Sequence, residues 1–190
     1  MAQGHLDRLS SIDAGFLHVE EGGAHMHIGA VALFAGPAPS IEEFREHIAS
    51  RLPRLPRYRH RIQEMPFGTG RPLWVEDDTF RLDFHVRHTA LPAPGSKREL
   101  LNLVDRIVGQ RLDRTKPLWE IWLVEGLAGG RWAMVGKTHH AMIDGVSGVD
   151  LLSVLFDLSP DSPADEAQPW EPQPSPGTVD LLTNGAKGLA

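Results

Sequence analysis

The chain has 190 residues, which suits one domain or slightly more. Its content of 41% hydrophobic and 23% charged residues is typical of a folded globular protein, and its net charge of −6 argues against nucleic-acid binding. The absence of cysteine excludes disulfides, thiol catalysis and cysteine-bound metal centres. No apolar run approaches the roughly 20 residues of a membrane span, and the first ten residues lack a signal-peptide core. We therefore expect a cytoplasmic protein whose membrane contact, if any, is peripheral.

The first part of the chain predicts a short helical turn, a strand and a capped helix. The turn is expected over Leu9–Phe16, and the apolar run His27–Ala35 predicts a buried strand. Ser40 and Glu43 then form a capping box, in which the hydroxyl stands at the N-cap and the acid three residues later. This box predicts a helix that ends near Arg51.

The segment Leu52–Arg61 is irregular in sequence, because its two prolines forbid a continuous helix and its four arginines crowd it with charge. Two interpretations stay open: a solvated connector, or a surface for an anion or lipid headgroup. A second capping box starts at Ser96 and predicts a helix to about Leu112. Short strands are predicted between the two helices, over Arg61–Met65, Pro72–Glu76 and Phe84–Thr89.

The clearest elements are two β-rich runs, Trp119–Gly126 and Arg131–Thr138, separated by a glycine-rich turn that suits a hairpin. Trp119 and Trp122 would point to opposite faces of a regular strand, so both faces of the sheet need cover. Val146–Leu158 predicts an apolar helix. Ser159–Gly177 contains six prolines and predicts an extended or mobile linker.

The block His139-His140-Ala-Met-Ile-Asp144-Gly145 lies between the second strand of the hairpin and the apolar helix. Such a turn is held by a rigid scaffold yet is open to a ligand. Histidine has an unperturbed pKa near neutrality, so it can accept a proton and return it. Asp144 could fix the loop, and Gly145 permits a backbone conformation that a Cβ would forbid.

Two other kinds of site are less well supported. Neighbouring strand residues point apart, so His139 and His140 need not converge on a metal ion, and no HExxH or similar set completes a shell. We therefore predict no metal at this motif, and we interpret His25 and His27 as partly buried polar residues near a strand start. Ser147 is not in a GxSxG elbow and is interpreted as a helix N-cap or a residue of the first helical turn.

Three stretches together resemble bacterial wax ester synthase/diacylglycerol acyltransferases. Leu9–His18 resembles the opening of that family, Leu112–Glu120 its PLW region, and His139–Gly145 its HHxxxDG motif. The HHxxxDG motif alone is shared with condensation domains, chloramphenicol acetyltransferase-like enzymes and polyketide-associated acyltransferases. The other two stretches favour the branch of lipid metabolism that makes wax esters and triacylglycerol.

The resemblance implies an α/β half-domain of the chloramphenicol acetyltransferase-like fold, a mixed sheet with flanking helices. It implies an O-acyltransferase with acyl-CoA as co-substrate, no permanently bound cofactor, and a long-chain alcohol or diacylglycerol as acceptor. His140 would be the general base and His139 would support it. Asp144 would hold the loop by pairing with an arginine, for which Arg8 and the Arg51–Arg61 cluster are candidates, and Gly145 would serve through its backbone.

The resemblance also implies a two-half architecture. Residues 1–158 would form the motif-bearing N-terminal domain, 159–177 a proline-rich crossover, and 178–190 the start of a helix that leads to a C-terminal half on the same or a separate chain. We expect contact with a membrane or lipid inclusion to be peripheral. Two alternatives remain: another HHxxxDG acyltransferase of the polyketide-associated or condensation type, and a non-catalytic lipid-binding module.

Overall fold

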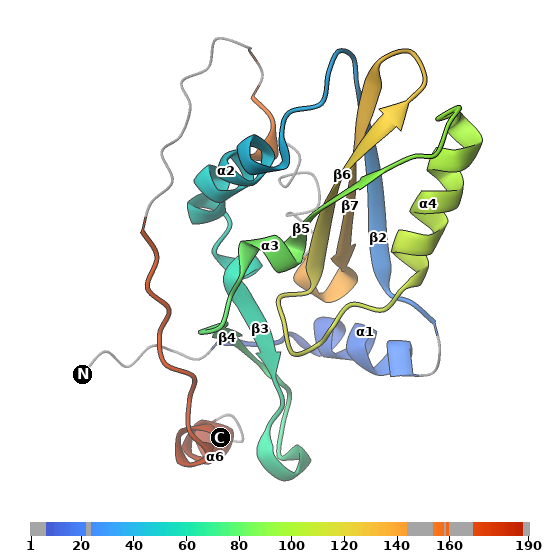
Figure 1. Ribbon diagram of the computed structural model, residues 1–190. Helices are drawn as coiled ribbons and strands as arrows, with labels where there is room; N and C mark the ends of the chain where they lie inside the picture. The colour runs from blue at the N-terminus through green and yellow to red at the C-terminus, as the bar shows by residue number, and fades with distance from the viewer. Residues whose placement is uncertain (1–6, 22–23, 144–153, 158, 160–168, 188–190) are drawn as a thin grey trace.

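The computed structural model describes residues 7–21, 24–143, 154–157, 159 and 169–187 (Figure 1). Two sheets organise them. The larger has the order β2-β7-β6-β5, formed by β2 (His27–Phe34), β7 (Arg131–His139), β6 (Trp119–Leu127) and β5 (Val86–Ala90). Its β2–β7 and β7–β6 pairs are antiparallel and its β5–β6 pair is parallel, so the predicted mixed sheet is confirmed. The smaller sheet has the order β1-β4-β3, formed by β1 (Asp7–Arg8), β4 (Leu73–Glu76) and β3 (His60–Gln63).

The predicted hairpin and both capping boxes are confirmed. Ser40 caps α2 (Ile41–Arg51) and Ser96 caps α4 (Lys97–Gly109), each with a glutamate at N3 that bonds back to the cap. Helix α4 ends three residues before the predicted Leu112. At this end the ammonium of Lys137 donates to the carbonyls of Ile107 and Gln110, which are free because the helix stops.

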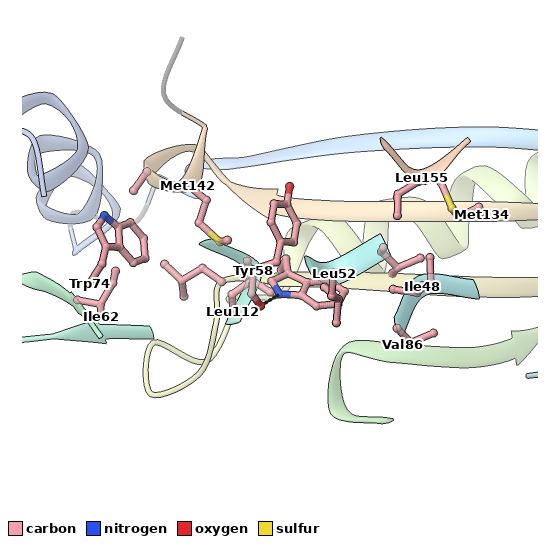
Figure 2. Close-up of a cluster of buried hydrophobic side chains, with 14 of the residues drawn as sticks. Ile48, Leu52, Tyr58, Ile62, Trp74, Val86, Leu112, Met134, Met142 and Leu155 are labelled. Carbon is pink, nitrogen blue, oxygen red and sulfur yellow. Dashed lines mark hydrogen bonds between the residues drawn. The ribbon is translucent and has the colours of Figure 1, made fainter. Parts of the chain in front are cut away.

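Helices cover both faces of the larger sheet, as the two tryptophans of β6 require (Figure 1). On one face, α4 packs its buried leucines against the sheet residues Val124 and Val135. On the other face lies the main core, where side chains of α2 and of the smaller sheet meet Trp119 and Met134 (Figure 2). The indole Nε1–H of Trp119 donates to the carbonyl of Tyr58 at 2.8 Å, so this large apolar side chain is buried without losing its polar bond.

The strand predicted over His27–Ala35 is present, but the prediction that it is buried is wrong. The strand exists as β2, but it lies at the edge of the larger sheet, and Ile28, Val31 and Leu33 are exposed. The apolar run predicts a strand because β-branched and apolar residues favour one. It does not show how many neighbours that strand has.

Two other segments differ from the prediction. Helix α1 (Ser11–Glu21) is longer than the expected turn, since Ser10 caps it and the glycine within it, Gly15, does not break it. The strand predicted over Phe84–Thr89 is split into a helical turn, α3 (Leu82–His85), and β5. The chain turns here because the buried ring of His85 inserts between Phe80 and Trp119 and binds the Trp119 carbonyl.

The arginine-rich segment is not simply a solvated connector. It folds into two 3-10 turns, η1 (Leu52–Arg54) and η2 (Pro56–Arg59), and it buries Leu52 and Tyr58 in the main core (Figure 2). A third 3-10 turn, η3 (Pro66–Gly68), connects β3 to β4. No helix in the part of the chain that the structure describes is long and apolar enough to cross a membrane.

The described part of the proline-rich linker, residues 169–177, is extended as predicted, and it is docked on the smaller sheet. Trp170 lies under the guanidinium of Arg59, 4.8 Å from the ring centroid, and packs edge-on against Phe80. The amide of Gln173 donates to Glu76 at 2.7 Å. The chain then enters α6 (Thr178–Lys187), whose Leu181 is buried with residues of the smaller sheet. Of the predicted helix Val146–Leu158, only residues 154–157 are described.

Candidate active site

The motif begins where β7 ends, and neighbouring chain segments hold the backbone there from both sides. The amide of His139 donates to the carbonyl of Leu118 at 2.9 Å, and the amide of His140 donates to the carbonyl of Met26 at 2.7 Å. The PLW stretch that leads into β6 and the loop that leads into β2 therefore fix the two histidines in succession. The chain continues as a 3-10 turn, η4 (His140–Met142).

The side chain of His139 is fully buried. Its Nδ1 accepts a hydrogen bond from the amide of Ala141 at 3.0 Å, which caps η4. Burial lowers the pKa of His139 to about 4, so the ring is neutral near pH 7. Since Nδ1 is an acceptor, the proton of the neutral ring is on Nε2. A buried neutral imidazole that caps the turn fits the supporting role predicted for His139.

His140 is only half-buried, and its ring lies elsewhere. It packs on Phe16 of α1, with ring centroids 4.0 Å apart and planes inclined by 34°. Its Nδ1 is buried and has no hydrogen-bond partner among the described residues. The two motif histidines thus have different environments, one sealed in the protein and the other reaching its surface. The roles predicted for them, a support and a base, remain predictions.

The turn that follows carries Met142 into the main core, where it lies near Tyr58 (Figure 2). Beside it is a cavity of about 550 Å³, lined by Ala141 and Met142 together with Tyr58 and Trp74. Arg54 and Arg57 line the same cavity. Asp7 and Asp13 line it as well. The volume lies in the range of ligand pockets, and a lining of mixed apolar and charged side chains suits an amphipathic molecule.

The arginines of the predicted cluster fall into two groups, those that line this cavity and those that do not. Arg54 and Arg57 lie where a headgroup or another anion could meet them, and Arg57 pairs with Asp7. The remaining members serve the fold instead: Arg51 pairs with Asp157, Arg59 stacks on Trp170, and Arg61 donates to Ser175.

A second set of charged residues surrounds His139, and the sequence analysis did not identify it. The carboxylate of Glu20, at the end of α1, is 2% exposed and accepts hydrogen bonds from Nε and Nη2 of Arg114 at 3.3 and 3.0 Å. Its Oε1 lies 3.1 Å from Nε2 of His27, and its Oε2 lies 3.7 Å from Nε2 of His139. Burial opposes ionisation of Glu20, but Arg114 and the two imidazoles outweigh it and lower the pKa of this carboxyl. Glu20 lies beside, and Arg114 within, a stretch that carries the family resemblance. This position was the signal in the sequence that could have pointed to them.

One group among the described residues has the spacing of a metal site. Ligand atoms of Glu20, His25 and His27 all lie within 4.8 Å of one another. The charge of Glu20 is already neutralised by Arg114, and His27 also bonds the Val108 carbonyl through Nδ1 at 3.1 Å. These contacts account for the group, so we assign no ion to it. His27 is partly buried as predicted, with its side chain only 1% exposed. His25 is exposed, so the prediction of partial burial is wrong for it.

Asp144, Gly145 and Ser147 lie outside the described residues. The predicted pairing of Asp144 with an arginine, the backbone role of Gly145 and the interpretation of Ser147 therefore remain predictions.

The larger sheet is mixed, and the histidine pair lies on the turn after one of its inner strands. Comparison with known proteins shows which class of protein has this arrangement. The family model for the wax ester synthase/diacylglycerol acyltransferase catalytic domain matches residues 9–189. The chain belongs to this family.

Named relatives and a solved structure support the assignment. The chain is 40% identical over 177 residues to a probable diacylglycerol O-acyltransferase, tgs3, of Mycobacterium tuberculosis, and the match covers 92% of this chain and 65% of the relative. It is 43% identical over 156 residues to a putative diacylglycerol O-acyltransferase of Mycobacterium bovis, covering 81% of this chain and 34% of the relative. The wax ester synthase/diacylglycerol acyltransferase of Marinobacter aquaeolei VT8 superposes with a TM-score of 0.67 at 34% identity, covering 82% of this chain and 39% of that one.

More distant structures share the fold alone. The starter condensation domain of rhizomide synthetase superposes with a TM-score of 0.62 at 14% identity, covering 80% of this chain and 36% of that one. The predicted chloramphenicol acetyltransferase-like fold is thereby confirmed. The chain spans less than two thirds of the length of these relatives and solved structures.

Proposed function

We propose that this chain is the motif-bearing part of an acyl-CoA-dependent O-acyltransferase, which esterifies a long-chain alcohol or a diacylglycerol. The observation that carries the proposal is the placement of His140. Its amide is bound to the Met26 carbonyl, just before β2, the preceding His139 is bound to Leu118, just before β6, and its imidazole is half-exposed, at the position where the family has its second motif histidine. A base must be held rigidly and still reach a substrate, and His140 satisfies both conditions.

The chemistry requires one base and no acyl-enzyme intermediate. His140 removes the proton of the acceptor hydroxyl as its oxygen attacks the thioester carbonyl. The tetrahedral intermediate then collapses, the carbon–sulfur bond breaks, and the imidazolium returns its proton to the CoA thiolate. The products are an ester and free CoA. Neighbouring His139 stays neutral near pH 7 because burial lowers its pKa to about 4, so it does not compete as a base or repel the imidazolium.

The cavity beside η4 supports a lipid substrate. Its apolar wall of Tyr58, Trp74 and Met142 can hold an acyl or alkyl chain within reach of the motif turn. Arg54 and Arg57 at the same cavity can meet the polar end of such a molecule. The same charges would favour peripheral contact with an anionic lipid surface.

We further propose that the second wall of the substrate channel comes from polypeptide outside these residues, on this chain or on another. The exposed apolar residues of β2 lie on the edge strand that pairs with β7, from Ile28 beside the motif to Leu33 further along the strand. An interface there should bury more than roughly 1,000 Å² in total, with apolar groups at its centre. Acyl transfer by the chain alone and with the non-matching part of the Marinobacter relative tests this. Full activity of the monomeric chain would contradict it.

The base assignment is tested by His140→Ala in the complete enzyme, with both walls of the channel present, measured with palmitoyl-CoA and either hexadecanol or a diacylglycerol as acceptor. We expect acyl transfer to fall roughly 100-fold or more in a variant that keeps its fold. His88→Ala is the matched control, because His88 is an exposed histidine on β5, at the opposite edge of the sheet from β2. Near-normal kcat in folded His140→Ala would overturn the assignment. Binding of lipid without acyl transfer would favour the non-catalytic module, and a requirement for a carrier protein would favour the condensation-type alternative.

A further inference from the structure

One face of α1 contacts both motif histidines. Phe16 and Glu20 are four residues apart in this helix, so they lie one above the other on the same face. Phe16 packs on the ring of His140, and Glu20 lies against the ring of His139. The helix therefore contacts the proposed base and its neighbour at the same time, and whatever fixes α1 also fixes the motif.

Arg114 fixes this end of α1. Its guanidinium binds Oε2 of Glu20, and its Nη2 also donates to the carbonyl of Leu17 at 2.6 Å. A side chain and a backbone group of the last helical turn are thus bound by one planar cation. Because an arginine fork holds its partners in a defined geometry, the Glu20 carboxylate can be aimed as well as neutralised.

The carboxylate is aimed at the proton-bearing side of His139. The amide of Ala141 donates to Nδ1, so the neutral ring carries its proton on Nε2, and this atom faces Oε2 of Glu20 at 3.7 Å. The distance is too long for a hydrogen bond. It is short enough for a buried carboxylate to favour an N–H over a lone pair at that position. The opposite tautomer would turn a lone pair towards the carboxylate and a second N–H towards the Ala141 amide.

We propose that Glu20, held by Arg114, is a positioning residue that keeps His139 in its Nε2–H tautomer and so fixes the turn η4 that carries His140. The proposal rests on the proposed function in one respect, namely that His140 is the base. Glu20 itself neither touches substrate nor exchanges a proton. Its effect passes through the ring of His139 to the Ala141 amide, and from there to the first turn after the base.

The direct test is nitrogen NMR of the histidine rings in the ¹⁵N-labelled chain. We expect wild type to show His139 as a single Nε2–H tautomer and Ala141 with a protected amide. Glu20→Gln should give a mixture of tautomers and raise amide exchange at Ala141 by roughly tenfold or more. Glu42→Gln is the matched control, because Glu42 is an exposed glutamate of α2. Samples are treated with a chelator, so that a metal ion bound near Glu20 does not mimic the result.

A variant that is only less stable would keep the tautomer of its folded population, so the ring signals separate positioning from a general structural role. Arg114→Lys provides a second variant, since it retains the charge at a partly exposed site and loses the fork. It should shift the tautomer in the same direction as Glu20→Gln. A single Nε2–H tautomer and unchanged Ala141 protection in the folded variants would overturn the proposal.

Acyl-transfer kinetics provide the second readout. Glu20→Gln should lower kcat by roughly 10- to 100-fold with little change in KM for the acyl donor, because the base is displaced while the lipid cavity is intact. Glu20→Asp, which keeps the charge, should recover part of the loss. The two proposals fail in different ways. Full activity of His140→Ala would remove the base assignment, whereas the NMR result would still decide whether Glu20 positions His139.

Discussion

Strands β6 and β2 are both rich in apolar residues, but they occupy opposite kinds of position. Strand β6 lies inside the larger sheet, with helices or core on both faces, and most of its residues are buried. Strand β2 is an edge strand whose residues are mostly exposed or half-buried. A similar pattern of hydrophobicity therefore has two physical causes. In β6 it supplies core packing, whereas in β2 we attribute it to a surface that another polypeptide covers.

The largest expected effect on the free energy of unfolding comes from a matched pair of leucine truncations. Leu123 of β6 is 0% exposed and Leu33 of β2 is 55% exposed. Leu123→Ala should lower the free energy of unfolding by about 2–5 kcal/mol, because it loses buried area and leaves a cavity. Leu33→Ala should change it by less than about 0.5 kcal/mol. Urea unfolding of both variants measures the difference, and equal losses would break the comparison.

The next effect concerns pH and the two histidines that face each other in register, His139 of β7 and His27 of β2. Burial lowers the pKa of His139 to about 4, below the unfolded value of 6.5, so the folded state binds fewer protons. The neutral His139 ring therefore contributes to the free energy of unfolding fully above pH 6.5. This contribution, about 3 kcal/mol in total, is lost as the pH falls towards 4. The pKa of His27 is also lowered by burial, so it acts in the same direction.

Urea unfolding at about pH 7.5 and 4.5 checks this sign. His139→Gln should flatten the pH dependence more than His27→Gln, because the inner strand holds the more strongly shifted histidine. Stability that rises as the medium is acidified through this window would contradict the assignment of neutral buried imidazoles.

Two glycines provide a case in which the edge strand β2 is more tightly packed than the inner strand β7. A Cβ on Gly29 of β2 would lie 2.8 Å from Cγ2 of Val108 in α4, whereas a Cβ on Gly136 of β7 would meet nothing within 4 Å. Gly29→Ala should cost about 1–2 kcal/mol through overpacking. Gly136→Ala should be neutral or stabilise by up to about 1 kcal/mol, since alanine loses less chain entropy on folding. Thermal unfolding of both variants shows whether the edge strand is tightly packed at this one point.

The smallest expected effect on stability is that of Val31→Thr, a change of similar shape on the exposed part of β2. It should alter the free energy of unfolding by less than about 0.5 kcal/mol. It should nevertheless weaken association with the polypeptide that covers β2, because a hydroxyl would be buried in an apolar interface. Analytical ultracentrifugation of the chain mixed with the polypeptide proposed to cover β2 measures this association. Unchanged association, also in a variant altered at Ile28 and Leu33, would remove β2 from the proposed interface.

Local signals predicted much of this fold. The capping boxes at Ser40 and Ser96 fixed two helix starts because their hydrogen bonds form within four residues. The hairpin was predictable because two β-rich runs flank a glycine-rich turn. The exposure of β2 and the helical turn before β5 were not predictable, because they depend on sheet order and on the insertion of His85 beside Trp119.

In the candidate site, too, some residues could be predicted from the sequence and others could not. The motif identified His139 and His140, and the strand–turn setting was confirmed. The partners Glu20 and Arg114 were missed, because an acid and an arginine far apart in sequence carry no signal of pairing until the fold brings them together. His27 was predicted to be partly buried from its place near a strand start. Its side chain is buried because it contacts Glu20 and the Val108 carbonyl, which only the fold brings to it.

The pairing of β2 with β7 has a consequence for the order in which the chain folds. The hairpin β6–β7 joins neighbouring segments and can close early, whereas His27 and His139 are roughly 110 residues apart along the chain. The backbone bond from His140 to Met26 can form only after that long loop has closed. The turn that bears the proposed base would therefore be completed late in folding. It could also open locally when the edge strand detaches, with the hairpin still intact.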